Sequence, residues 1–180
     1  MTGSQEALVP EFSRMVKVDQ VRRMAVETHI AANDAERAAL ARRFGLVALD
    51  RLEADYSLSE EKDAILARGR VRATLAQPCV ATGEPVPEII DTDFALRFVV
   101  EAADTPPEGE ELELDAQDVD TVGYDGQALD MGEAVAETMA LAMTPFPRSP
   151  DADAYLKQAG VLSEEQASPF AALLALKDKG

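Results

Sequence analysis

The only cysteine of the 180-residue chain, Cys79, begins the stretch "CVATGEPVPE" and is the first residue that could do chemistry. A cysteine acts as a nucleophile when a base and an electropositive setting lower its pKa. The only histidine, His29, lies fifty residues upstream, and nothing in the sequence brings the two together. A zinc site needs about four Cys, His or carboxylate ligands, and Thr82, three residues after the cysteine, is a poor one. We interpret Cys79 as a packing residue where a strand enters a turn, and we expect no metal and no cofactor.

A row of arginines is the second candidate. Arg68, Arg70 and Arg72 alternate with apolar residues in "ILARGRVRATL" and so share one face of an expected strand. Three guanidinium groups on one face could contact an anion such as RNA phosphate. The neighbouring expected strands carry four carboxylates on the matching face: Glu53, Asp55, Asp91 and Asp93. Cross-strand ion pairs would therefore explain the row without any ligand, and we favour this interpretation over a contact with an anion or RNA.

No catalytic motif accompanies these residues. The sequence has no Gly-rich phosphate loop, no Ser-His-Asp set and no histidine metal cluster. We therefore expect that the protein is not an enzyme.

Charge is the strongest signal in the composition. The chain has 34 acids and 17 bases, a net charge of −17, and no lysine or arginine lies between Arg97 and Arg148. The acidic segment there would repel a nucleic-acid backbone, whereas a basic protein partner would fit it. A solvated loop that only keeps the protein soluble is the alternative interpretation.

The elements that must position these residues are strands first and helices last. Two short strands are expected within residues 13–18 and 22–32, followed by a helix over 34–44 with Asn33 and Glu36 as a capping box. Period-two alternation then predicts three strands, within 52–58, 65–75 and 92–101. Residues 102–128 have the composition of an acidic loop, in which "ELEL" could form an edge strand. Asp130 and Glu133 begin a helix over 131–143.

The fold class that follows is α+β, with an antiparallel, meander-rich sheet of about five or six strands packed by two or three helices. The length suggests a single domain over residues 1–180. The first residues lack a basic start and an apolar run, and no apolar stretch reaches the 18 residues of a membrane span, so we expect a cytoplasmic protein without membrane contact.

Residues 163–180 are expected to form a C-terminal helical tail. Four of its residues fall at the spacing of one helical face: Phe170, Leu173, Leu174 and Lys177. Such a stripe could dock in the groove of a partner, or it could fold back onto the protein's own sheet.

Two separated motifs resemble those of the YceD-like family, the large ribosomal RNA subunit accumulation proteins of bacteria. They are "CVATGEPVPEIIDTDFALRF" and, after the acidic segment, "GQALDMGEAVAETMALAMTPFPRSP". The residues of this chain at the family's motif positions are Cys79, Thr82, Pro85, Asp130, Gly132 and Glu133. The resemblance covers roughly residues 10–178.

The resemblance implies involvement in the synthesis, processing or accumulation of 23S ribosomal RNA, with no known catalytic residues. Many members have a second cysteine where this chain has Thr82 and a third near the position of Ser149. If those cysteines hold a metal in some members, this chain lacks too many ligands to do so.

We therefore expect a non-enzymatic factor whose partners are ribosomal precursor RNA or basic ribosomal or processing proteins. The alternative is an acidic protein-binding module for a basic ribosomal protein or a ribonuclease, with no direct RNA contact. The sequence leaves the oligomeric state open.

Overall fold

The structure, a computed structural model, describes residues 10–23, 27–101 and 120–161. The chain divides into two compact units, one of residues 1–76 and 87–143 and one of residues 77–86 and 144–180. The expectation of a single domain over residues 1–180 stays a prediction.

Seven strands and four helices lie within the described ranges. The strands are β1 (Met15–Lys17), β2 (Thr28–Ala31), β3 (Ala48–Glu61), β4 (Ala64–Pro78), β5 (Pro85–Val100), β6 (Asp120–Tyr124) and β7 (Ala128–Asp130). The helices are α1 (Val18–Val21), α2 (Asp34–Arg43), α3 (Met131–Ala142) and α4 (Ala152–Gln158). The expected α+β class is confirmed.

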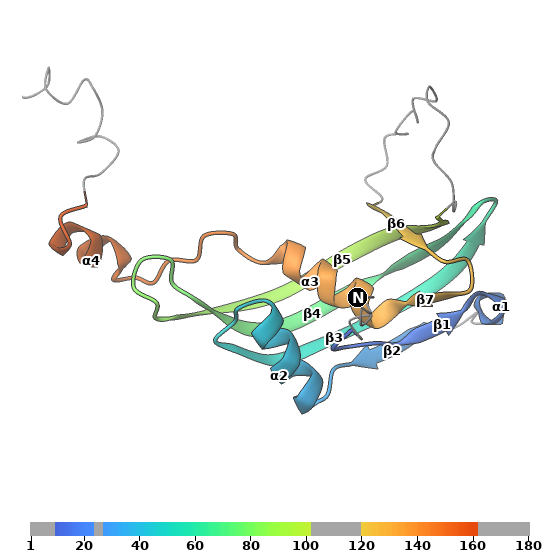
Figure 1. The fold of residues 1–180 in the computed structure, drawn as a ribbon, viewed down its shortest axis with the longest axis horizontal. Helices are drawn as coiled ribbons and strands as arrows, with labels where there is room; N and C mark the ends of the chain where they lie inside the picture. Colours follow the sequence, from blue (N-terminus) through green and yellow to red (C-terminus); the bar gives the residue numbers. More distant parts are fainter. Residues whose placement is uncertain (1–9, 24–26, 102–119, 162–180) are drawn as a thin grey trace, which may run out of the picture. The chain divides into compact units, whose positions relative to one another are not determined.

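The main sheet has five strands in the order β2-β3-β4-β5-β6. β3 pairs antiparallel with both β2 and β4, which agrees with the expected meander, whereas β6 pairs parallel to β5. A second sheet joins β1 to β7, with Val16 opposite Leu129. Figure 1 shows the long strands side by side, with β6 beside one end of β5.

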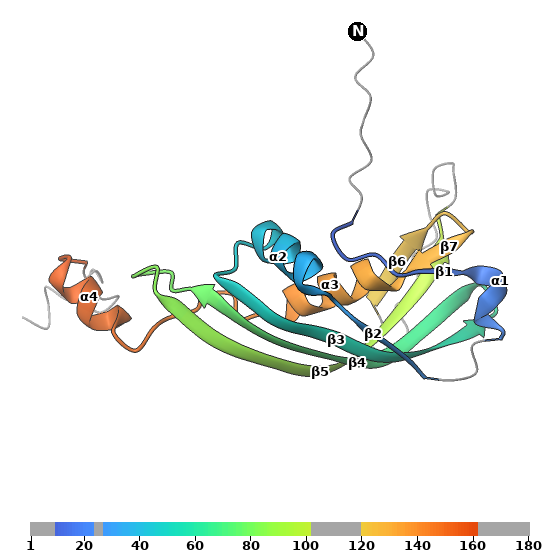
Figure 2. The ribbon, with the colours of Figure 1, turned by 90° about the horizontal axis from the view of Figure 1, so that it is seen from below.

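One face of the main sheet forms the core. The expected alternation is confirmed on β3, where Leu52, Ala54, Tyr56 and Leu58 are all buried. On β4, Ile65, Ala67, Val71, Ala73 and Leu75 are buried in the same way. Both α2 and α3 lie on the same side of the sheet (Figure 2). Met131, Val135 and Met139 of α3 are fully buried there, as their helical spacing predicts.

The two helices begin as the sequence predicts. Asn33 and Glu36 form the capping box of α2, and Gly45 just beyond the helix has a φ of 65°. The carboxylate of Asp130 accepts hydrogen bonds from the backbone N–H groups of Gly132 and Glu133 at the start of α3.

One expectation needs correction, and two expected strands are shorter than their ranges. The acidic loop expected over 102–128 contains a strand, because residues 120–124 pair with β5 as β6 and half-bury Val122 and Tyr124. The strand expected within 13–18 is short, is followed by the one-turn helix α1, and pairs with β7 outside the main sheet. The strand expected within 22–32 is described only at Thr28–Ala31. The "ELEL" stretch lies outside the described residues.

Candidate functional site

The arginine row lies on the face of β4 opposite the core, as predicted. On the neighbouring β3, Glu53 is directly opposite Arg72, and Asp55 is directly opposite Arg70. Arg72 reaches diagonally to Asp55, with 2.7 Å between Nη1 and Oδ2, and lies 3.6 Å from Glu53. Arg72 is therefore held by the two carboxylates of β3.

Arg70 is paired with the other neighbouring strand. Its Nε lies 2.6 Å from Asp91 and its Nη1 lies 3.0 Å from Asp93, both on β5. The Arg70 guanidinium lowers the pKa of the Asp91 carboxyl below its usual value. The expected cross-strand ion pairs of Arg70 and Arg72 are thus confirmed.

The third arginine differs from the other two. Arg68 lies opposite Ser57 of β3, is exposed, and has no ion pair with any residue in the described ranges. The contact of this row with an anion or RNA stays a prediction, and Arg68 is the member most available for it.

The ion-pair network continues to the edge strand β2. The Nδ1 atom of His29 lies 2.7 Å from Oδ1 of Asp55. The Arg72 guanidinium, and after it the His29 imidazole, lower the pKa of the Asp55 carboxyl. Since His29 is bonded to a surface carboxylate, it belongs to the outer face of the sheet.

The turn between β4 and β5 contains Cys79, whose side chain is buried. Its sulfur accepts hydrogen bonds from the backbone N–H of Ser149 at 3.2 Å and from that of Thr82 at 3.5 Å. Hydrogen bonding from the backbone N–H of Ser149, and after it from the side chain of Thr82, lowers the pKa of the Cys79 thiol to about 6. The sulfur is therefore a hydrogen-bond acceptor that ties residues 77–86 to residues 144–161.

Cys79, Thr82 and Ser149, the three positions compared with the family's cysteines, contact one another at this turn. Besides the contacts to sulfur, the hydroxyls of Thr82 and Ser149 lie 3.3 Å apart. Pro85, another motif position, opens β5 directly after the turn. In the described part of the chain, no three His, Cys, Asp or Glu side chains gather in a way that could hold a metal. The expectation that the protein binds no metal stays a prediction.

The second motif holds the start of α3 against the N-terminal segment. Besides capping its own helix, the carboxylate of Asp130 accepts a hydrogen bond from the hydroxyl of Ser13 at 2.6 Å. A Cβ atom at Gly132 would lie 2.9 Å from the backbone nitrogen of Arg14, so only glycine permits this approach. Glu133 forms a bidentate ion pair with Arg43 of α2, at 2.6 and 2.9 Å. These motif positions have structural contacts that explain their residue types.

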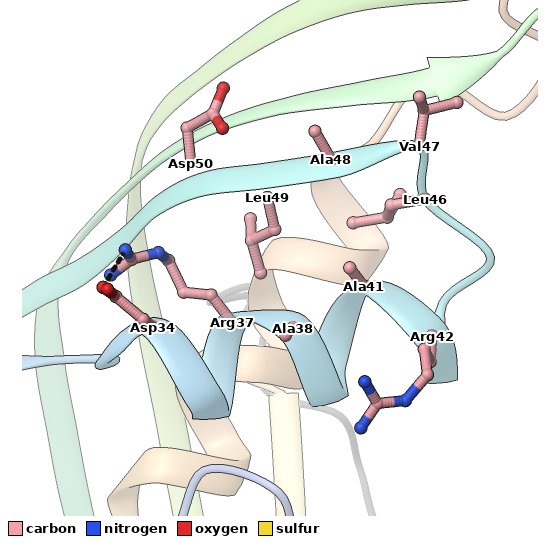
Figure 3. Close-up of a pocket in the computed structure, with 10 residues that line it drawn as sticks. All are labelled: Asp34, Arg37, Ala38, Ala41, Arg42, Leu46, Val47, Ala48, Leu49 and Asp50. Atoms are coloured by element: carbon pink, nitrogen blue, oxygen red, sulfur yellow. Dashed lines mark hydrogen bonds and ion pairs between the residues drawn. The ribbon is translucent and has the colours of Figure 1, made fainter.

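A pocket of about 430 Å³ lies between α2 and the start of β3. The guanidinium of Arg37 lies 2.6 Å from the carboxylate of Asp34. Figure 3 shows these two side chains turned toward each other, while Arg42 and Asp50 point away from the cleft. Because no set of polar groups converges in it, this pocket does not provide a catalytic arrangement.

The tail residues Phe170, Leu173, Leu174 and Lys177 lie outside the described residues. Among the described helices, none is long and apolar enough to cross a membrane.

The family comparison agrees with both motifs. The family model described as "Large ribosomal RNA subunit accumulation protein YceD" matches residues 67–177. The chain belongs to the YceD family. The match begins within β4, so it is shorter than the span of roughly 10–178 expected from the sequence, yet it contains the Cys79 turn, the arginine row and α3. No curated protein and no solved structure matches the chain.

Membership of the YceD family associates the protein with the accumulation of large-subunit ribosomal RNA. Sequence reasoning identified the motif positions and the arginine row. It missed the contact of Glu133 with Arg43, because a glutamate at the third position of a helix is explained by capping alone.

Proposed function

We propose that this protein is a non-enzymatic factor that promotes the synthesis, processing or accumulation of 23S ribosomal RNA by binding components of the large-subunit precursor. The observation that carries this proposal is the match to the YceD family over residues 67–177. The proposed place of action is the cytoplasm, where bacterial ribosomes are assembled.

A test compares cells with and without the protein. We expect loss of the protein to lower the ratio of 23S to 16S ribosomal RNA and to raise the fraction of unprocessed 23S precursor. A plasmid copy of the protein should restore both values. Unchanged ratios and precursor levels in the deletion strain would contradict the proposal.

A second candidate is an acidic binding module for a basic ribosomal protein or ribonuclease, with no direct RNA contact. Two observations favour it: the net charge is −17, and Arg70 and Arg72 are already paired with carboxylates. Both features weaken the attraction of RNA phosphates.

The two candidates are separated by affinity purification from lysate with and without ribonuclease. A basic protein that remains bound after ribonuclease treatment, and that also binds the purified protein, supports the second candidate. Loss of all partners after ribonuclease, together with binding of labelled 23S precursor by the purified protein, supports direct RNA contact.

A further inference from the structure

On the β5 side of the main sheet, the described strands cover only part of the edge. β5 runs from Pro85 to Val100, but its pairing with β6 covers only Leu96 to Val100. In the described part of the chain, no strand pairs with this edge of β5 before Leu96. An edge that lacks a neighbouring strand presents backbone N–H and C=O groups to which another strand can bind.

A groove lies at the point where β6 begins. It has a volume of about 480 Å³ and is lined by residues 92–96 of β5, residues 120–122 of β6 and one face of α3. Its apolar lining includes Phe94 of β5, Val122 of β6 and Leu141 of α3. Leu141 is 82% exposed, so a large apolar side chain at the groove is left uncovered by the residues that the structure describes.

The groove is also acidic. Its lining contains three carboxylates, Asp93, Asp120 and Glu137, and no lysine, arginine or histidine. Asp93 is bound to Arg70 on the outer face, whereas Asp120 and Glu137 have no ion pair with the described residues. An apolar floor with two available carboxylates suits an extended segment that carries both apolar and basic side chains on the face toward the groove.

We propose that this groove binds an extended basic segment of a partner protein, which adds a strand beside residues 92–95 of β5, in line with β6. Main-chain hydrogen bonds to β5 hold the segment, its apolar side chains contact Phe94 and Leu141, and its basic side chains pair with Asp120 and Glu137. This inference rests on the second candidate function and names the class of partner and its site.

Other occupants fit the charge less well. RNA phosphates would be repelled by the three carboxylates. The acidic groove would also repel a second copy of the chain, whose net charge is −17. It would likewise repel the chain's own residues 102–119, which include seven acids and no base. Charge complementarity therefore favours a basic partner segment.

The test uses the full-length protein and a fluorescent, acetylated nine-residue peptide, Lys-Lys-Val-Val-Lys-Lys-Val-Val-Lys, in which each face of the extended strand carries both lysine and valine. Leu141→Lys and Glu137→Lys place a cation in the groove, and both side chains are exposed, so the fold should be kept. Ile89→Lys is the matched control, because Ile89 is a 79% exposed residue of β5 that does not line the groove. Fluorescence anisotropy gives the affinity of each variant for the peptide.

We expect Leu141→Lys and Glu137→Lys to weaken peptide binding at least about tenfold and Ile89→Lys to leave it within about twofold. Methylation of alternate peptide nitrogens on the edge that faces β5 should abolish binding, because it removes the strand's hydrogen bonds. A second peptide, methylated on the nitrogens of its other edge, should still bind. Equal binding by all three protein variants, or full binding by both methylated peptides, would overturn the proposal.

Two further results would identify another occupant and equally overturn it. A dimer that dissociates in Leu141→Lys, seen by sedimentation, would assign the groove to a second copy. Peptide binding that becomes tighter when residues 102–119 are replaced by a glycine-serine linker of equal length, which keeps the connection between the parallel strands β5 and β6, would assign it to that segment.

The inference and the proposed function fail in different ways. If deletion of the protein lowers 23S ribosomal RNA but Leu141→Lys restores it fully, the groove proposal fails and the function stands. If deletion leaves ribosomal RNA unchanged while the groove variants lose the peptide, the proposed function fails and the groove binds a basic segment in another role.

Discussion

The carboxylate of Asp130 accepts a hydrogen bond from the backbone N–H of Arg14, with 2.7 Å between the two atoms, although the residues lie 116 positions apart in the chain. The same carboxylate caps α3 and accepts a hydrogen bond from the hydroxyl of Ser13. One side chain therefore joins the start of the chain to the start of the third helix.

Replacing Asp130 should be costly for this reason. We expect Asp130→Ala to lower the free energy of unfolding by about 3 kcal/mol, because it removes a helix cap and leaves the Arg14 N–H without its acceptor. Urea denaturation measures the change. Asp151→Ala is the matched control, since Asp151 stands at the N-cap of α4 but makes no side-chain capping bond, and it should change stability by less than about 0.5 kcal/mol. Equal effects would refute the capping role.

The buried face of α3 gives a second prediction. Met139 is fully buried, and Met139→Asp would place an unpaired carboxylate in the core. We expect a loss of several kcal/mol, of the order of the total stability of about 5–15 kcal/mol of a typical domain. Glu137→Lys on the exposed side should stay within about 0.5 kcal/mol. A melting temperature unchanged by Met139→Asp would show that α3 does not pack as described.

The hydrogen bonds to Cys79 predict a pH dependence. Because the donors lower the pKa of the thiol to about 6, the folded state favours the thiolate more than the unfolded state does, where the pKa is about 8.5. The resulting stability is fully present above about pH 8.5 and is lost as the pH falls to about 6. Urea midpoints of the wild type and Cys79→Ser, measured from pH 5.5 to 9, should diverge toward high pH. Parallel curves would contradict the prediction.

The same turn predicts metal content. The wild type, purified without chelator, should contain no stoichiometric zinc by elemental analysis, because Cys79 has the hydroxyls of Thr82 and Ser149 as neighbours in place of thiols. The double variant Thr82→Cys with Ser149→Cys, kept reduced, should gain zinc because it places three thiols together. One equivalent of zinc in the wild type would rule the prediction out.

Deletion of residues 168–180 tests the tail. If its stripe of Phe170, Leu173, Leu174 and Lys177 docks on a partner, the deletion should leave the melting temperature unchanged and abolish co-sedimentation with ribosomal precursors. A large fall in the melting temperature would instead make the stripe part of the protein's own core.

The sheet and its two long helices could be predicted because their signals are local. Tyr56 and Val71 are buried as period-two alternation requires, and Asn33 begins α2 through bonds within four residues. The ion pairs of Arg70 and Arg72 followed from the same alternation, because facing strands place opposite charges together.

The remaining elements depend on partners distant in sequence. β6 has only five residues, and its pairing with Leu96 to Val100 is parallel, which nothing in "DTVGY" indicates. The small sheet of β1 and β7 likewise depends on Val16 meeting Leu129. The groove beside Leu141 arises only once α3 and β6 are placed, so no sequence pattern could have revealed it.

The pairing of β1 with β7 also affects how the chain folds during its own synthesis. Strands β2 to β5 are complete once Val100 has been added, whereas β1 has no partner strand until Asp130 is in place. At a synthesis rate of about 5–20 residues per second, roughly 6 to 23 seconds pass between the synthesis of β1 and that of its partner strand β7. During that interval the backbone N–H and C=O groups of β1 lack their partner strand and are open to chaperones on the nascent chain.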